Sequence, residues 1–200
     1  MNKQQMIVAA IVALPTSAFA DAIITNSFET DTGLEVYGTV ASTEVSGLEA
    51  PGITDIKVRA PEFGFGIGLK DAPVAVEFSV MPNVEASESA AGEWQTEEYD
   101  LSFSYAASSL LIEPMETAFG SPFFRGGIIG AEYSLEHTST TYLGDASTTR
   151  YTETDYGPLY GIGWSGEALD GALGYRFELR KAEVFGQKPD MTSVSLSYRF

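Results

Sequence analysis

The amino-acid sequence predicts an all-β protein, an eight-stranded antiparallel up-and-down transmembrane β-barrel. Three observations predict this fold: an N-terminal export signal, eight segments in which apolar residues recur at every second position, and a last segment that runs to Phe200. A spacing of two is typical of strands whose two faces meet different surroundings, whereas apolar residues of an amphipathic helix recur about every 3.6 residues.

Residues 1–20 have the composition of a secretory signal peptide. A basic start at Lys3 precedes an apolar run from Met6 to Leu14, and Ala18-Phe19-Ala20 supplies a small-residue cleavage site. The apolar run is too short for a membrane-spanning helix, which needs about 20 residues. We therefore predict a signal peptide over 1–20, a periplasmic N-terminal segment over 21–31, and one barrel domain over 32–200.

Charge and residue usage exclude several function classes. The chain carries 28 acidic and 11 basic residues, a formal net charge of -17. The only charged residue in 1–20 is Lys3, so removal of this segment gives a net charge of -18. A chain this negative is a poor partner for nucleic acid. The absence of cysteine excludes disulfides, thiol nucleophiles and cysteine-zinc sites. No phosphate loop or metal-spaced cluster appears, so we expect no cofactor and no metal.

Eight segments carry the two-residue period. In chain order, the apolar residues on their predicted lipid-facing sides are Leu34, Val36 and Val40; Phe63, Phe65, Ile67 and Leu69; Val74, Val76, Phe78 and Val80; Tyr99, Leu101, Phe103 and Tyr105; Ile129, Ala131, Tyr133 and Leu135; Tyr156, Tyr160, Ile162 and Trp164; Leu173, Tyr175, Phe177 and Leu179; and Val194, Leu196, Tyr198 and Phe200. Ile56 and Val58 are out of phase with Phe63, which predicts a bulge at Pro61.

Alternation alone does not show which face points outward. A soluble periplasmic barrel that binds a ligand in an apolar interior has the same period and remains an alternative. The apolar faces, however, contain no charged residue, as expected where an arginine or lysine would cost about 2–4 kcal/mol at the bilayer midplane. We therefore predict that these faces meet lipid and that a charge network fills the lumen, formed by Glu77, Glu98, Asp100, Glu132, Arg176, Glu178 and Arg180.

The connections between the segments alternate in length. Residues 70–73 and 166–169 are short turns, whereas 84–93 and 139–149 read as longer loops rich in Ser, Thr, Gly and acid. Short turns at one end and long loops at the other are typical of outer-membrane barrels. Two connections depart from this pattern, because 107–121 is long and 185–190 is short.

The C-terminal segment resembles the closing strand of small bacterial outer-membrane barrels of the OmpA transmembrane-domain and OmpX type. The resemblance is carried by Val194, Leu196, Tyr198 and Phe200, by the hairpin of 161–164 and 173–181, and by the glycine-rich stretch 122–130. It covers residues 32–200 and implies a location in the outer membrane of a Gram-negative bacterium.

The resemblance also implies partners and a role. The outer-membrane assembly machinery would read the C-terminal strand through Phe200, and Arg176 and Glu178 would occupy charged interior positions of the seventh strand, although Gly163 replaces the acidic partner that relatives place on the preceding strand. The implied protein is a non-enzymatic monomer with a structural or surface-interaction role, in contact with outer-membrane lipid and lipopolysaccharide. A narrow ion or water channel is an alternative, because some interior positions are small.

A lipid A modifying enzyme is a further alternative. His137, the only histidine, forms a His-x-Ser pair with Ser139 that resembles outer-membrane lipid A deacylases, in which a glutamate such as Glu132 or Glu153 would orient the imidazole. A histidine beside serines is also expected by chance in a Ser/Thr-rich loop, so we assign no catalytic residue. Four loop carboxylates are candidates for gathering divalent cations, although an acidic run is usually a solvated face: Glu85, Glu88, Glu93 and Glu97.

Overall fold

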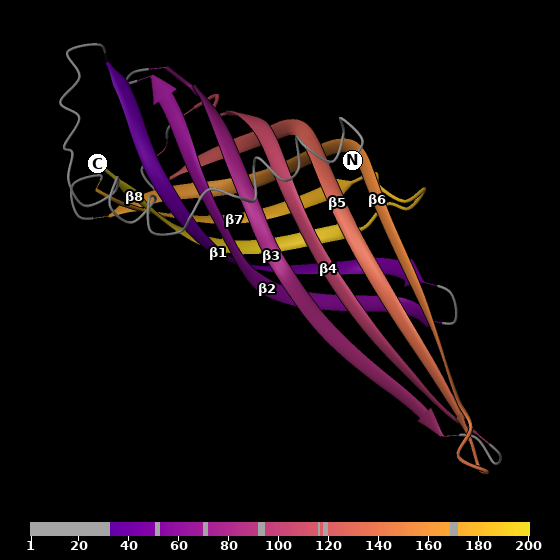
Figure 1. Cartoon of the computed structure of the whole chain (residues 1–200). Helices are drawn as coiled ribbons and strands as arrows, with labels where there is room; N and C mark the ends of the chain where they lie inside the picture. The colour runs from indigo at the N-terminus through magenta and orange to yellow at the C-terminus, as the bar shows by residue number, and fades with distance from the viewer. Residues whose placement is uncertain are drawn as a thin grey trace.

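The computed structural model describes residues 33–50, 53–69, 72–91, 95–115, 117, 120–168 and 172–200, so the predicted signal peptide and the segment 21–31 lie outside the described residues. Eight antiparallel strands form one closed barrel, which confirms the predicted fold class (Figure 1). The strands are β1 (Leu34–Ala50), β2 (Ile53–Leu69), β3 (Val74–Ala91), β4 (Gln95–Ile112), β5 (Ser121–Thr141), β6 (Ala146–Ala168), β7 (Leu173–Ala182) and β8 (Asp190–Arg199).

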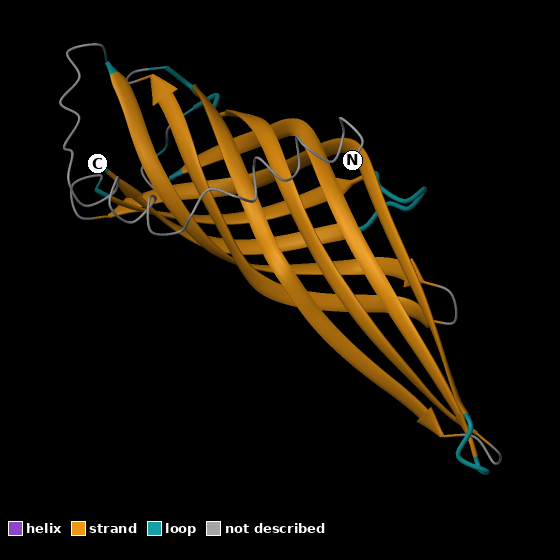
Figure 2. Ribbon diagram, viewed as in Figure 1, coloured by secondary structure: helices purple, strands orange, loops and turns teal. Residues whose placement is uncertain are grey.

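Each strand pairs with its neighbours in sequence, and β8 closes the ring by pairing with β1, from Tyr37 opposite Arg199 to Ser46 opposite Asp190. Figure 2 shows the described part of the chain as strands and loops. That part contains no helix long and apolar enough to cross a membrane. We call the end with the β2–β3, β4–β5 and β6–β7 connections the short-turn end, and the opposite end the far end.

Next to the short-turn end, the outer wall is a belt of apolar side chains that point away from the lumen. Its exposed members are Leu34, Val40, Phe63, Ile67, Leu69, Val74, Val76, Phe78, Leu110, Ile112, Phe124, Ile128, Tyr160, Ile162, Trp164, Tyr175, Phe177, Leu179, Val194, Leu196, Tyr198 and Phe200. A continuous exposed apolar surface around a closed barrel is the surface that lipid requires. The belt agrees with the outer faces predicted for β1, β2, β3, β6, β7 and β8.

The predicted outer faces of the fourth and fifth strands are wrong. Leu101, Phe103, Tyr105, Ile129, Ala131, Tyr133 and Leu135 are all buried inside the barrel. The residues of β4 and β5 that belong to the belt lie nearer the short-turn end, on the opposite face of each strand. Both strands are long enough to pass from the lipid belt into the region beyond it. The prediction took the apolar residues that lie beyond the belt, where they form the core of the barrel, as the residues that face lipid.

The eight strands also differ in how far they extend. β7 and β8 have 10 residues each, whereas β3 to β6 have 18 to 23 and continue past the ends of their neighbours (Figure 1). The stretches 84–93 and 139–149, predicted as loops, are therefore largely strand. Val84 in the first stretch and the four threonines of the second are residues that favour strands. We call the four segments 84–91, 95–104, 132–141 and 146–155 the protruding sheet.

The predicted bulge at Pro61 is also wrong. The β1–β2 register runs unbroken through Ser42 opposite Pro61, so Ile56 and Val58 simply belong to the face of β2 that points into the barrel. Register shifts lie elsewhere, on the β1–β2 ladder between Val45 and Leu48 and between Leu48 and Ala50, and on the β3–β4 ladder between Met81 and Val84. Pairing between β2 and β3 stops at Phe63 opposite Val80. The next outward pair in this register would be two prolines, which have no N–H to donate.

Candidate functional site

At the level of the apolar belt, the lumen is crossed by a network of three arginines and three glutamates. In order of contact the six residues are Arg176, Glu77, Arg125, Glu178, Arg180 and Glu62. Glu77 accepts from Arg176 Nη1 at 2.5 Å and from Arg125 Nη2 at 2.6 Å. Arg125 Nε donates to Glu178 Oε1 at 2.5 Å, and Arg180 Nη2 donates to Glu62 Oε2 at 2.5 Å.

The network has no net charge, because it contains three arginines and three glutamates. Each guanidinium lies beside at least one carboxylate. Hydroxyl groups take part of the remaining hydrogen-bonding capacity: Arg125 Nη1 donates to Ser109 at 2.9 Å, and Thr43 donates to Glu62 at 2.6 Å. The Arg176 guanidinium also lies 5.0 Å from the centre of the Tyr37 ring. Buried charges are tolerated only when paired and hydrogen-bonded in this way. These side chains fill the lumen at this level.

The structure brings together four of the seven residues predicted for the lumen network: Glu77, Arg176, Glu178 and Arg180. Sequence reasoning missed Glu62 and Arg125. Arg125 did give a signal, because it has the same parity as Ile129 and Tyr133, which were assigned to lipid. A charged residue in phase with a supposedly lipid-facing row indicates that the row changes surroundings.

The other three predicted network residues, Glu98, Asp100 and Glu132, do not belong to the lumen. They are exposed on the outer face of the protruding sheet, where Asp100 accepts from Ser87 Oγ at 2.6 Å and Glu132 from Thr154 Oγ1 at 3.2 Å. Their assignment failed with the faces of β4 and β5. Hydrated carboxylates are suited to a sheet surface beyond the lipid belt.

Toward the far end, the interior of the barrel becomes apolar. Its core consists of Val45, Leu48, Ile56, Val58, Ala60, Met81, Leu101, Phe103, Tyr105, Ala107, Ile129, Ala131, Tyr133, Leu135, Leu159, Ala182, Val184 and Met191. The β1–β2 hairpin supplies one side of this core, and β4 and β5 supply the other. The lumen is thus filled at two levels, by ions within the belt and by packed hydrocarbon beyond it.

The short β7–β8 connection covers part of this core. Val184 and Gln187 exchange backbone hydrogen bonds across a two-residue turn in which Phe185 and Gly186 have φ of 58° and 67°, the positive values of a type I′ turn. The Phe185 ring packs edge-on against Tyr133 at 4.8 Å. In the same connection, a hydrogen bond from Lys188 to Glu183, together with the charge of that carboxylate, raises the pKa of the lysine ammonium.

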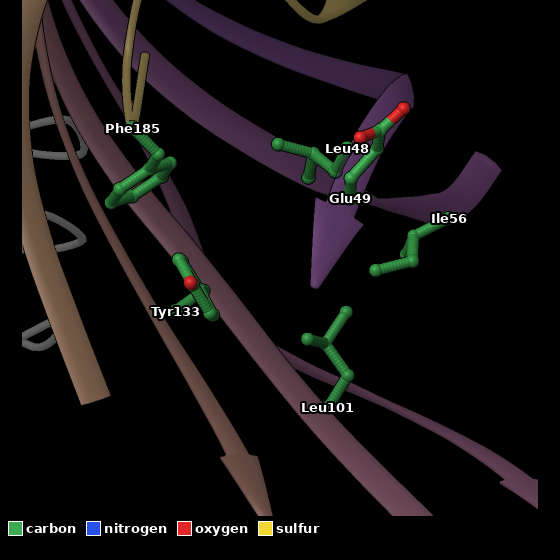
Figure 3. A pocket seen from close by; sticks show the side chains of 6 residues that line it. All are labelled: Leu48, Glu49, Ile56, Leu101, Tyr133 and Phe185. Carbon is green, nitrogen blue, oxygen red and sulfur yellow. The ribbon is translucent and has the colours of Figure 1, made fainter. Parts of the chain in front are cut away.

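A shallow opening remains between this turn and the β1–β2 hairpin. Figure 3 shows the side chains that line it: Leu48, Glu49, Ile56, Leu101, Tyr133 and Phe185. The Glu49 main chain and the Gln187 side-chain amide exchange two hydrogen bonds of 2.8 Å beside it. The opening is small and mainly apolar, so we assign it no reaction.

Neither glutamate considered for lipid A chemistry forms a hydrogen bond or ion pair with His137 in the described part of the chain. His137 stacks on Tyr99, with ring centres 4.5 Å apart. Glu132 lies on the opposite face of β5 from His137, while Glu153 accepts hydrogen bonds from Tyr133 and Tyr151 at 3.2 and 2.8 Å. Within the described part of the chain, no three histidine or acidic residues are grouped as metal ligands. Of the four proposed cation-binding carboxylates, Glu93 lies outside the described residues, as does the Glu88 side chain.

The C-terminal strand completes the ring, and its last residues lie at the edge of the belt nearest the short-turn end. Phe200 donates its backbone N–H to the Val36 carbonyl at 3.2 Å, and its ring packs edge-on against Tyr198 at 5.1 Å. The ring lies over Gly38, where an added Cβ would make an ordinary contact with it at 3.7 Å. The residues predicted as an assembly signal therefore lie on the outside of the strand that closes the barrel.

Comparison with known proteins supports the fold. The attachment invasion locus protein Ail of Yersinia pestis matches with a TM-score of 0.53 and 11% identity over 84% of this chain and 97% of Ail. Its complex with the heparin analogue sucrose octasulfate matches with a TM-score of 0.51 over the same shares. The fold is that of a small outer-membrane β-barrel of the OmpA and OmpX type. Neisserial surface protein A also matches, with a TM-score of 0.41 and 14% identity over 84% of this chain and 97% of that protein.

Neither a protein-family model nor a curated protein matches the sequence. At these identities the likeness extends to the fold and not to any activity. The apolar belt, the closed ring and this fold together make the protein an outer-membrane barrel whose far end carries the protruding sheet.

Proposed function

We propose that the protein is a non-enzymatic outer-membrane barrel that holds an acidic β-sheet at the cell surface for contact with a partner. The observation that carries this proposal is the change of chemistry along the barrel: a lipid-facing belt with an ionic plug, followed by a water-facing sheet over an apolar core. The plug and the core are suited to anchoring, and the protruding sheet is the part that a partner can reach.

The filled lumen argues against the alternative of a channel. Eight strands enclose a space about wide enough for side chains to fill, and both the ion network and the apolar core occupy it. Recording single-channel currents from the purified protein in a planar bilayer tests this directly. We expect no discrete openings, and a stable conductance would contradict the plugged state.

The charge of the protruding sheet does not suit the ligand bound by the structural neighbour Ail. Sucrose octasulfate is a polyanion, whereas the protruding sheet contains nine carboxylates and one arginine. A polyanion would be repelled by such a surface. We therefore propose no heparin-like ligand, and around the belt we expect ordinary contacts with outer-membrane lipid and lipopolysaccharide.

We also propose that the C-terminal strand is read by the outer-membrane assembly machinery and that the barrel is a monomer.

The surface role requires the far end to be outside the cell. Because the chain has no native cysteine, single cysteines report topology cleanly. We expect Leu143→Cys, at the tip of the β5–β6 hairpin, to react with a membrane-impermeant maleimide on intact cells. The matched variant Met115→Cys, exposed at the short-turn end, should react only after the outer membrane is permeabilised. The reverse pattern would contradict the proposed function.

A further inference from the structure

The shallow opening between the β7–β8 turn and the β1–β2 hairpin has aromatic rings along one side. Tyr133 and Phe185 line the opening, and their rings pack edge-on with centres 4.8 Å apart (Figure 3). Tyr151 on β6 extends this row, because its ring lies 5.7 Å from that of Tyr133 at an interplanar angle of 43°. We call Phe185, Tyr133 and Tyr151 the ring row. The face of an aromatic ring carries negative charge density, which attracts cations.

Hydrogen bonds to two carboxylates of β6 hold the ring row in place. Glu153 accepts from the hydroxyls of Tyr133 and Tyr151 at 3.2 and 2.8 Å. Asp155 accepts from the Phe185 N–H at 2.5 Å. The bond to Glu153 also raises the pKa of Tyr151, so this phenol stays neutral. A ligand that binds here does not have to order these side chains, which reduces the cost of binding.

Two carboxylates flank the ring row without a basic partner in the described part of the chain. Glu49 lines the opening on the side of the β1–β2 hairpin, and Glu153 accepts only from the two tyrosine hydroxyls. The lysine of the neighbouring turn, Lys188, is paired with Glu183 at 3.0 Å, and Arg150 lies on the outer face of β6. With negative charge on both sides, the opening attracts a cation.

The lining of the opening decides which kind of cation fits. Of the six lining residues, only Glu49 and Tyr133 have polar groups in their side chains, and the Tyr133 hydroxyl already donates to Glu153. An ammonium with N–H groups would lose its strong hydration here and find few acceptors. A quaternary ammonium has no N–H to satisfy, and aromatic rings bind its methyl groups. A phosphate attached to that cation would meet carboxylates, which repel it.

We infer that this opening binds a small, singly charged organic cation of the trimethylammonium type that carries no phosphate. The methyl groups of the ligand contact the rings of Phe185 and Tyr133, and its charge lies near the Glu49 carboxylate. Glu153 adds negative charge from β6. This inference rests on the proposed surface role, because a far end outside the cell is in contact with ligands of the surroundings, and it names one ligand class for that end.

The probe for the test is choline, titrated against the full-length barrel in dodecyl maltoside micelles and followed by saturation transfer to its methyl protons. Empty micelles serve as the blank. Three relatives of choline separate the contributions: its uncharged isostere, with carbon in place of the nitrogen; ethanolamine, which carries N–H groups; and phosphocholine, which adds a phosphate. We expect choline to bind at least about tenfold more tightly than each of the three.

The contribution of charge is tested with Glu49→Gln. Glutamine has nearly the same shape, and the two hydrogen bonds between the Glu49 main chain and the Gln187 side chain do not involve the carboxylate. We expect choline binding to weaken by about fivefold, while binding of the uncharged isostere changes by less than about twofold.

The contribution of the rings is tested with Phe185→Leu, which keeps an apolar side chain and removes the aromatic face. Phe185→Tyr keeps that face, and Tyr142→Leu removes an exposed ring outside the row. We expect Phe185→Leu to weaken choline binding by about fivefold and the other two variants to change it by less than about twofold. Heat-modifiable migration on SDS gels shows that each variant is folded, and Tyr151→Leu replaces Phe185→Leu if the latter does not fold.

Three results would each overturn the cation site: equal binding of choline and its uncharged isostere, equal effects of Phe185→Leu and Tyr142→Leu, or no saturation transfer above that of empty micelles. Phosphocholine that binds as tightly as choline would contradict the exclusion of an attached phosphate. Any of these results leaves the proposed function standing, because cysteine labelling on cells tests the surface location of the far end independently.

Discussion

The barrel at the level of the lipid belt and the barrel at its far end have opposite chemistry on the same strands. On the outer face of β5, Phe124 and Ile128 meet lipid, and Glu132 follows them further along the strand. On the inner face of that strand, Arg125 joins the ion network and Ile129 enters the apolar core. The outer face thus changes from apolar to charged between residues 128 and 132, and the inner face changes from charged to apolar between residues 125 and 129.

An alternating strand therefore does not keep its apolar residues on the same face along its whole length. A period of two shows that two faces differ, but the surroundings decide which face is apolar. In lipid the outer wall is hydrocarbon and the lumen holds the polar groups, whereas in water the arrangement is that of an ordinary soluble sheet with its core inside. A strand long enough to leave the bilayer must therefore change its pattern along its length.

The largest expected effect comes from the centre of the ion network. Arg125→Met removes the one side chain that pairs with both Glu77 and Glu178, and it leaves two buried carboxylates without that partner. We expect the free energy of unfolding to fall by about 3–5 kcal/mol. Urea titration in lipid vesicles, followed by tryptophan fluorescence, measures this loss.

The control for this change lies outside the network. Arg59→Met removes an arginine whose 2.8 Å ion pair with Glu44 is exposed, and exposed pairs contribute about 0–1 kcal/mol. Equal losses for the two variants would mean that the network does not stabilise the barrel as a buried unit.

The next effect tests the apolar level of the interior. Leu101→Ala creates a cavity in the far-end core, for which we expect a loss of about 2–5 kcal/mol. Leu110→Ala on the same strand faces lipid, and mobile acyl chains can fill the space, so its loss should be less than half as large. The same titration compares them, and similar losses would contradict the assignment of Leu101 to a packed core.

The sequence was informative where a strand segment has only one surrounding. The short strands β7 and β8 lie largely within the belt, and their lipid-facing residues were predicted from alternation and from the absence of charge. It failed on β4 and β5, because the apolar residues Phe103 and Tyr133 look the same whether they meet lipid or a core. Glu62 and Arg125 were missed for a related reason: ion pairs between strands distant in sequence depend on how the ring closes.

An arginine placed at two positions on the outer face of β5 tests where the lipid belt ends. Ile128→Arg puts a guanidinium in the lipid belt and should cost up to about 2–4 kcal/mol, depending on its depth. Ser134→Arg lies on the same face of β5, six residues further along, in the protruding sheet, and should change stability by less than about 0.5 kcal/mol. The yield of heat-modifiable protein and the unfolding titration both report the difference. Equal costs would mean that the belt does not end between these two positions.

The smallest effect concerns the turn that covers the far-end core. Gly186 has a φ of 67° and open space around its Cα, so Gly186→Ala meets only the strain of a left-handed backbone, about 1–2 kcal/mol. Because the turn lies beyond the lipid belt, we expect faster amide hydrogen exchange at Val184 and Gln187 with unchanged exchange in the belt. Ala72→Gly, in the connection at the opposite end, should leave exchange at this turn unaltered. Faster exchange throughout the barrel would instead show that the two levels unfold as one unit, since a local opening exposes only the hydrogen bonds of the segment that opens.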